Sequence, residues 1–236
     1  EYSASVSSDG KTLIFTSRRS DTKGGRVDEE FDHQYYEDVY ISTWNEELNE
    51  WSEAESVEGR LNSEFHDACL NISPDGSYIF VYRNIPRATK SGDIYISKKS
   101  KKGSWGTPKP VSKGKYVNSS YFESSASITE DEETLFFVSD RPGGKGMADI
   151  YMAKKDGRNW GEPVNLGDSI NTDLDEKFVF VHPNGKTLFF SSQGHNNMGG
   201  YDIFVSHLVD GKWSKPANLG YPINTVGEEK TFSITK

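Results

Sequence analysis

The sequence predicts an all-β fold made of β-propeller blades, because four short motifs recur in the same order with a period of about 55 residues. No window of a dozen residues keeps the apolar spacing of an amphipathic helix, whereas several keep the alternation of a β-strand. Short strands separated by turn dipeptides, four to a repeat, are the pattern of a four-stranded antiparallel blade.

The four recurring motifs define the aligned positions. A tryptophan, an Asp-hydrophobic-aromatic triplet, a hydrophobic-Asn-Ser/Thr triplet and a turn dipeptide appear once in every repeat. The tryptophans are Trp51, Trp105, Trp160 and Trp213, the aspartates are Asp38, Asp93, Asp149 and Asp202, and the asparagines are Asn62, Asn118, Asn171 and Asn224. The turn dipeptides are Asp9-Gly10, Asp75-Gly76, Glu132-Glu133 and Asn184-Gly185.

These positions divide the chain into four complete blades within one propeller. The blades cover residues 1–60, 61–116, 117–169 and 170–222, and residues 223–236 supply the first strand of a further or closing blade. In the third repeat we expect strands at 124–129, 134–139, 149–154 and 159–164. Since residues 229–235 repeat the pattern of 176–182, we expect a parent protein with five or six blades.

The repeated motifs have structural explanations that need no ligand. The tryptophan lies across the outer strand and covers the next blade, and the aspartate accepts hydrogen bonds from turn N–H groups. A column of acids at the start of the innermost strand allows two interpretations. It forms a ring at one mouth of the channel that binds cations or basic peptide groups, or it accepts hydrogen bonds from the preceding Asn-Ser/Thr turn. Recurrence in every blade favours the second interpretation for Glu1, Asp67, Glu123, Glu176 and Glu229. The first interpretation keeps Asp67, Glu123 and Glu176 among the candidate binding residues.

Composition excludes several classes of function. The net charge of -9 and the absence of a basic stripe argue against nucleic acid as a partner. The longest apolar runs have about four residues, far below the roughly 20 of a membrane-spanning helix, so no membrane insertion is expected. The single cysteine, Cys69, excludes an intrachain disulfide, and its strand pattern predicts an inert, half-buried thiol.

Specific strings in the third repeat resemble a known family. They are Ser139-Asp140-Arg141-Pro142-Gly143-Gly144, Asp149-Ile150-Tyr151, the segment 160–167 and Ile170-Asn171-Thr172. They resemble the WD40-like, TolB-like (PD40-type) propeller repeats of Bacteroidetes periplasmic proteins, which often carry an OmpA-like peptidoglycan-binding domain. The resemblance implies a periplasmic, outer-membrane-associated module of an OmpA-family envelope protein or of the type IX secretion system.

A binding site is expected where the repeat is broken. Blade two has Arg83-Asn84-Ile85 in place of the Ser-x-Arg column and also differs at His66, Asp67, Cys69 and Tyr82. Blade one has a long loop over residues 18–37, and long propeller loops commonly carry contacts. The candidate residues in that loop are Asp28, Glu29, Glu30, Asp32, His33, Tyr35 and Tyr36.

The function that fits these features is a non-enzymatic scaffold that binds an envelope protein or peptide, with peptidoglycan reached through a domain outside this sequence. The alternative is a carbohydrate-binding or glycoside-processing propeller, in which Asp67 and Glu123 are the carboxylates to test. No metal or cofactor is predicted, because the acidic loop lacks EF-hand spacing and the five histidines form no short ligand pair.

Overall fold

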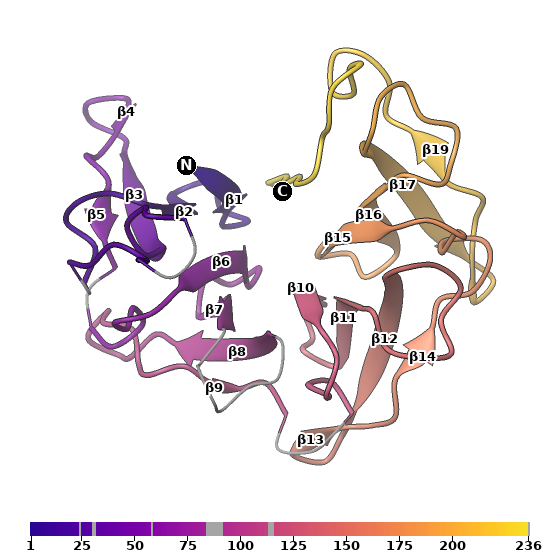
Figure 1. Ribbon diagram of the computed structural model, residues 1–236, viewed down its shortest axis with the longest axis horizontal. Helices are drawn as coiled ribbons and strands as arrows, with labels where there is room; N and C mark the ends of the chain where they lie inside the picture. Colours follow the sequence, from indigo (N-terminus) through magenta and orange to yellow (C-terminus); the bar gives the residue numbers. More distant parts are fainter. Residues whose placement is uncertain (24, 30–31, 58, 84–91, 113–115, 236) are drawn as a thin grey trace. The chain divides into compact units, whose positions relative to one another are not determined.

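The computed structural model describes residues 1–23, 25–29, 32–57, 59–83, 92–112 and 116–235 and consists of antiparallel sheets joined by loops (Figure 1). No helix occurs in these residues, and therefore none that could span a membrane. The chain divides into two compact units, Glu1–Val111 with Ile234–Lys236 and Ser112–Ser233. Each unit contains two blades, which confirms the all-β class and the four predicted blades.

The first unit holds blades one and two, each built as a meander in which sequential strands pair. Blade one contains β1 (Tyr2–Val6), β2 (Thr12–Ser17), β3 (Asp38–Asn45), β4 (Glu50–Trp51) and β5 (Glu55–Ser56). Blade two contains β6 (Asp67–Ile72), β7 (Tyr78–Arg83), β8 (Asp93–Lys98) and β9 (Lys109–Pro110).

The second unit holds blades three and four with the same order. Blade three contains β10 (Glu123–Ile128), β11 (Thr134–Ser139), β12 (Asp149–Asp156), β13 (Asn159–Trp160) and β14 (Val164–Asn165). Blade four contains β15 (Glu176–Val181), β16 (Thr187–Ser192), β17 (Asp202–Val209), β18 (Lys212–Trp213) and β19 (Ala217–Asn218). The strands of every blade lie within the predicted residue ranges.

Three details of the predicted strands were wrong. The single outer strand expected at 159–164 is two short strands, β13 and β14, that pair with different parts of β12. The third turn dipeptide was placed one residue too late. Glu132 has φ 57 and occupies the position of Gly10, Gly76 and Gly185, so the turn dipeptide of this blade is Asp131-Glu132. Residues 229–235, expected to supply the first strand of a further blade, form no strand.

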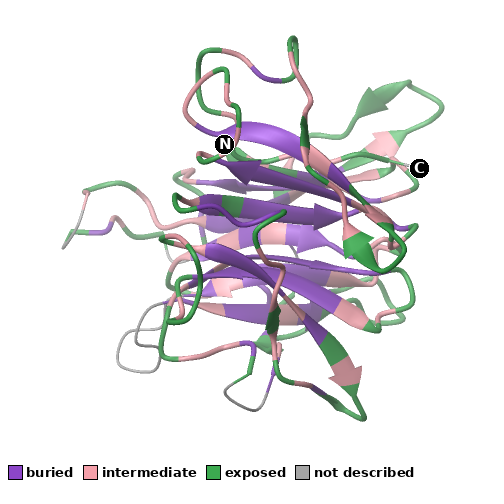
Figure 2. Cartoon of the chain, turned by 90° about the vertical axis from the view of Figure 1, so that its right-hand side faces the viewer, coloured by how far each residue is buried: buried purple, intermediate pink, exposed green. Residues whose placement is uncertain are grey.

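The core of each unit lies between its two blades, and the central parts of the strands are buried while the connections are more exposed (Figure 2). Hydroxyl groups on β2 and β10 join each of these blades to the innermost strand of the next blade in the same unit, β6 or β15. The Cys69 N–H donates to Thr16 Oγ1 at 2.8 Å in the first unit, and the Val179 N–H donates to Ser125 Oγ at 3.1 Å in the second. Cys69 is fully buried, not half-buried as predicted, and burial raises the pKa of its thiol.

The repeated asparagine binds the backbone of the third strand of its own blade. Asn171 accepts from the Ile150 N–H at 2.8 Å and donates to the Ile150 carbonyl at 2.9 Å. Asn62 makes the same two bonds with Val39, and Asn224 makes them with Ile203. The side-chain amide is thus the partner of one buried N–H, and it shares the carbonyl of the same residue with the backbone N–H of Val57, Leu166 or Leu219.

The repeated acids are structural. Both the N–H and the hydroxyl of the Ser or Thr that follows the asparagine donate to the carboxylate four residues later: Ser63 to Asp67, Ser119 to Glu123 and Thr172 to Glu176. All three carboxylates have 0% exposure. The turn interpretation is confirmed, and the inclusion of Asp67, Glu123 and Glu176 among ligand-binding residues is corrected.

The aspartate that begins the third strand also bonds as expected from its position after a turn. Asp149 accepts from the N–H groups of Lys145 and Gly146, and Asp202 accepts from those of Met198 and Gly199. Each of these aspartates receives a further bond from an outer-strand asparagine. The Asp column therefore fixes the loop that precedes the third strand.

Two of the repeated tryptophans, Trp105 and Trp213, pack against the preceding blade of their own unit, and not against the next blade as predicted. Trp105 is 4% exposed and packs with Ile14 and Val57 of the blade-one core, and Trp213 contacts Phe136 edge-on with ring centroids 5.9 Å apart. Trp160 is also buried, whereas Trp51 is partly exposed and rests on Trp44.

Candidate functional site

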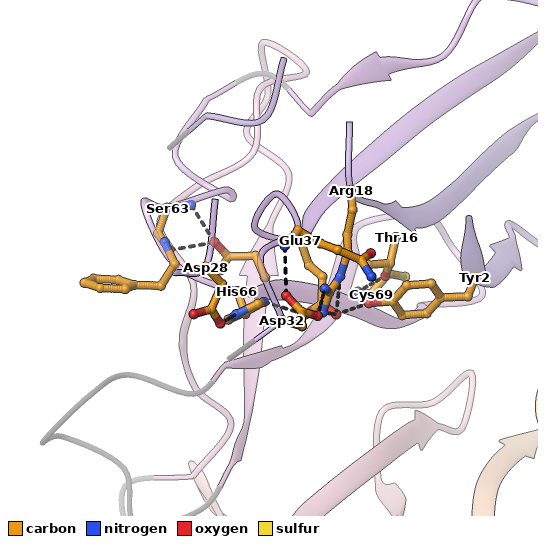
Figure 3. A network of polar contacts seen from close by, with 12 residues as sticks. Tyr2, Thr16, Arg18, Asp28, Asp32, Glu37, Ser63, His66 and Cys69 are labelled. Atoms are coloured by element: carbon orange, nitrogen blue, oxygen red, sulfur yellow. Dashed lines mark hydrogen bonds and ion pairs between the residues drawn. The ribbon is translucent and has the colours of Figure 1, made fainter. Parts of the chain in front are cut away.

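The long loop of blade one and the start of β6 meet in a network of polar contacts within the first unit (Figure 3). His66 is at its centre. Its Nδ1 lies 2.9 Å from Glu37 Oε2, its Nε2 lies 3.1 Å from Asp28 Oδ2, and its ring meets Tyr36 edge-on at a centroid distance of 4.7 Å. Only an imidazolium can donate from both nitrogens at once, so this geometry fits the protonated form.

Glu37 connects the histidine to a second cation. Arg18 Nη2 donates to Glu37 Oε1 at 2.8 Å, a second Arg18 nitrogen pairs with Asp32, and the Tyr2 hydroxyl donates to the same Glu37 oxygen. Arg18, Asp32, Glu37 and His66 are each only 15 to 25% exposed at the side chain. The network therefore holds both ends of the loop to the strands that flank it.

The backbone of the loop forms a small hairpin. The Asp28 N–H donates to the Gln34 carbonyl and the Tyr36 N–H to the Arg26 carbonyl, while Val27 pairs with Tyr35. His33 has φ 56, a left-handed conformation that fits the turn of the hairpin. The loop is thus a folded element and not only a solvated acidic segment.

The electrostatics of the network follow from these contacts. Burial tends to raise the pKa of Glu37, but hydrogen bonds from His66, Tyr2 and Arg18 outweigh it and lower the pKa to about 2. The hydrogen bond to Glu37 raises the pKa of His66, although burial acts against it. Burial and the Glu37 contact raise the pKa of the Tyr2 hydroxyl. At neutral pH the Glu37 carboxyl is therefore ionised and the Tyr2 phenol is neutral.

A polar hollow of about 580 Å³ adjoins the network. It is lined by Glu1, Tyr2, Ser17, Arg18, Arg19, Asp32 and Gln34. The Arg19 guanidinium lies 4.7 Å from the centre of the Tyr40 ring, which holds it in place beside the hollow. Arginine and tyrosine, which line this hollow, are enriched in protein interfaces.

The structure brings together some of the predicted site residues and not others. Asp28, Asp32, Tyr36 and His66 meet in the network, whereas the exposed Glu29 and His33 lie outside it, and His33 contributes only its N–H, which donates to the Asp28 carbonyl. Tyr35 is half-buried in the hairpin, and Glu30 lies outside the described residues. Sequence reasoning missed Tyr2, Arg18 and Glu37, which occupy ordinary-looking positions in or next to strands. The signal for Arg18 and Glu37 was their place at the two ends of the long loop.

The altered positions of blade two have a structural explanation. Arg83 is paired with Asp67 across β6 and β7, and it also donates to the Leu61 carbonyl. In blade three the guanidinium of Arg141, two residues further along, bonds Glu123 and the equivalent Val117 carbonyl. Arg83 is 8% exposed, so the expectation that it contacts a ligand is corrected. Tyr82 is half-buried, and burial raises the pKa of its hydroxyl.

No group of three or more His, Cys, Asp and Glu side chains is arranged to hold a metal ion in the described part of the chain. In the network, both nitrogens of His66 already face carboxylates, and Glu37 already accepts from Arg18 and Tyr2. A metal ion at this place would have to displace Arg18 or rotate His66 away from its partners.

The sequence matches no protein-family model and no curated protein. Solved structures are similar, however. TolB from Acinetobacter baumannii shares 16% sequence identity with a TM-score of 0.54, and the match covers 90% of this chain and 42% of that structure. A putative TolB from Agrobacterium tumefaciens shares 18% sequence identity with a TM-score of 0.54, and the match covers 92% of this chain and 61% of that structure. These likenesses show a β-propeller fold. The chain thus spans less than two thirds of the length of either TolB structure.

The same fold occurs in an enzyme. The α-L-arabinofuranosidase PaAbf62A from Podospora anserina, solved in complex with cellotriose, shares 11% identity at a TM-score of 0.53 over 94% of this chain and 68% of its own. Since one fold hosts both kinds of protein, the fold by itself does not distinguish binding from hydrolysis. The distinction depends on the residues of the site.

Proposed function

We propose that this chain is a non-enzymatic module that binds a protein or peptide, and that the loop of blade one forms the binding surface. The observation that carries the proposal is the pairing of residues 26–28 with residues 34–36, a hairpin whose Asp28 and Asp32 carboxylates contact His66 and Arg18 beside the polar hollow, while the adjoining Glu37 contacts both cations. A loop fixed in this way loses little conformational entropy when a partner binds.

The side chains on and around this loop suit a protein partner. Tyr2 is 43% exposed and Phe65, next to His66 in sequence, is 42% exposed, while Arg18 and Arg19 line the hollow. Aromatic residues and arginine carry most of the binding energy in protein interfaces. The surface combines such anchors with charged groups that are already paired, so that binding does not leave an uncompensated charge.

The contacts of the acids argue against glycoside hydrolysis. A glycosidase needs two carboxyl groups that can reach a sugar, one of them protonated. Asp67 and Glu123 have 0% exposure, and each is already bonded to a serine and an arginine. Neither can approach a substrate without breaking the turn that it holds together.

The cell envelope is the proposed location. The resemblance of the repeats to TolB-like propellers supports a periplasmic module associated with the outer membrane, within an OmpA-like or secretion-system protein. The fold shared with two TolB structures is consistent with that origin. An envelope protein or peptide is accordingly the partner to search for.

The test is capture of partners from an envelope extract of the source organism, with the immobilised wild-type chain and a variant lacking residues 26–34. Phe65→Ala serves as a point variant, and Tyr221→Ala, at an 80% exposed site in the second unit, is its control. We expect a specific partner whose binding falls roughly 30-fold in Phe65→Ala, as for an aromatic anchor, and is lost without the hairpin. Capture that is equal in all four proteins would refute the proposed surface.

A further inference from the structure

A pocket of about 600 Å³ lies in the second unit, between blades three and four. Its apolar wall consists of Phe136, Met152, Leu166, Leu208 and Trp213, and Lys154, Asp168, Ser169 and Lys212 are among its polar residues. Its volume falls within the range of about 300 to 1,000 Å³ that is typical of ligand sites. None of these residues takes part in the network of the first unit.

The corresponding place in the first unit is filled. Trp105, the counterpart of Trp213, is only 4% exposed and packs against Ile14, Ile41 and Val57. The backbone also closes over it, because Gly59 pairs with Trp105 and the Arg60 N–H donates to the Trp105 carbonyl. Trp213 instead remains partly exposed and meets Phe136 with its rings at 78°.

Two sequence differences explain why this pocket is open. Counting from the repeated asparagine, Asp168 occupies the position of Gly59, where a Cβ would lie 2.3 Å from the Trp105 carbonyl oxygen. A side chain there prevents the pairing that covers Trp105. Counting from the start of the second strand, Phe136 occupies the position of Ile14, and its larger ring occupies space into which a tryptophan could otherwise pack.

The charges at the rim favour an anion. Lys154 and Lys212 are exposed and make no ion pair among the residues that the structure describes. The one carboxylate at the rim, Asp168, lies 3.4 Å from the Lys145 ammonium and is therefore partly neutralised. The pocket thus pairs an aromatic and aliphatic wall with a net positive rim, although the chain as a whole carries a charge of -9.

From these observations we infer that this pocket is a second binding site, which accepts a large apolar side chain of a peptide that carries a carboxylate next to it. The apolar side chain contacts Trp213 and Phe136, and the carboxylate pairs with Lys154 and Lys212. The carboxylate comes either from an adjacent acidic residue or from the C-terminus of the peptide. A buried aromatic contact supplies most of the affinity in such a site, and the rim charges supply selectivity.

The experiment is titration calorimetry of the intact chain with three short synthetic peptides. The first is blocked at both ends and has a central Glu-Phe-Glu, the second has Gln-Phe-Gln instead, and the third is the Gln peptide ending in a free C-terminal Phe. We expect the first or the third peptide to bind at least tenfold more tightly than the second, with affinity that falls as salt is added. The comparison of the first and third identifies the source of the carboxylate.

Variants separate this site from the one in the first unit. Trp213→Ala should weaken binding roughly 30-fold, as for other aromatic anchors. The double variant K154E/K212E should reduce the preference for the charged peptide about tenfold. Since both lysines are exposed, we expect K154E/K212E to fold, and it therefore tests the pocket even if Trp213→Ala does not fold. Lys177→Glu, at an exposed position in β15, is the control for altered net charge, and deletion of residues 26–34 should have no effect.

Two results would overturn the inference: none of the peptides binds at millimolar concentration, or the charged peptides bind with the same affinity to wild type and to K154E/K212E. Either result leaves the partner capture by the hairpin of blade one unaffected. The two proposals therefore fail independently.

Discussion

At the scale of single residues, the blades are held by side chains that bond to main-chain groups which the sheets leave unpaired. Asn171 satisfies both the N–H and the C=O of Ile150, and Thr172 next to it donates twice to Glu176. Leaving a buried polar group without its partner costs about 1 to 3 kcal/mol. Short polar side chains are therefore as important to this fold as its apolar core.

Replacing Asn171 by alanine should lower the free energy of unfolding by about 1 to 3 kcal/mol, because the Ile150 N–H loses its partner, whereas the Ile150 carbonyl still accepts from the Leu166 N–H. Urea denaturation followed by tryptophan fluorescence measures the change. Asn196→Ala, at an exposed position in the same unit, is the control and should shift stability by less than about 0.5 kcal/mol. Equal effects of the two substitutions would show that the side-chain bonds to Ile150 are dispensable.

The pair of Asp67 and Arg83 predicts a non-additive pattern. Arg83→Met leaves the Asp67 carboxylate buried without its cation and should destabilise the chain by about 3 to 5 kcal/mol. The double variant D67N/R83M should lose less, because it buries no charge and the amide oxygen of an asparagine still accepts from Ser63. Denaturation of the two variants, with Arg158→Met at an exposed site as control, tests the pattern. A double variant that is no more stable than Arg83→Met would contradict it.

At the scale of elements, the loop of blade one differs from the others because ion pairs, and not turn motifs alone, hold it. His66 contributes two of these pairs, to Glu37 and Asp28, while Arg18 contributes two others, to Glu37 and Asp32. Tyr2 and Tyr36 complete the groups that face the network. The contacts that hold the hairpin therefore include a histidine, whose charge depends on pH.

The pH dependence of the loop follows from His66. Its pKa in the folded chain is raised above 6.5, so its contribution to stability is complete below pH 6.5 and is lost as the pH rises through the raised value. The stability difference between wild type and His66→Gln should be largest at pH 6 and shrink toward pH 9. Thermal denaturation across this range measures it, and His207→Gln, at an exposed histidine, is the control. A difference that does not vary with pH would mean that His66 is neutral in the fold.

Much of each blade could be predicted from the sequence, since the period, the strand positions and the roles of the Asn and acid columns are local patterns. The network around Glu37 could not, because it joins Tyr2, Arg18 and His66 from three separate strands or loops. Arg83 was misinterpreted for a different reason. It lies in the column of Ser139, but its long side chain reaches the group that Arg141 reaches from two residues away. Aligning the repeats compares backbone positions and does not show where the charged end of a long side chain lies.

At the scale of the whole molecule, buried acids determine how stability varies with pH. Burial raises the pKa of Asp38 to about 6, and burial also raises the pKa values of Asp67, Glu123 and Glu176. An acid whose pKa is raised by folding binds more protons in the folded chain, so stability increases as the pH falls through that window. The raised pKa of His66 in the first unit likewise makes stability increase as the pH falls. Burial lowers the pKa of His195 in the second unit, which makes stability decrease as the pH falls.

The chain should therefore be more stable at pH 5.5 than at pH 8.5, and Asp38 allows the cause to be tested. Its Oδ1 is buried without a hydrogen-bond partner among the residues that the structure describes, while Oδ2 accepts from the Lys23 N–H, a bond that an asparagine can also accept. Asp38→Asn should raise the melting temperature at pH 8.5, where it removes a buried charge, and have little effect near pH 4, where the aspartate approaches protonation in the folded chain. Asp156→Asn, at an exposed position, should change neither value. If Asp38→Asn shifts the melting temperature equally at both pH values, the ionised carboxylate of Asp38 is not what costs stability, and the acid dependence must come from the other buried acids.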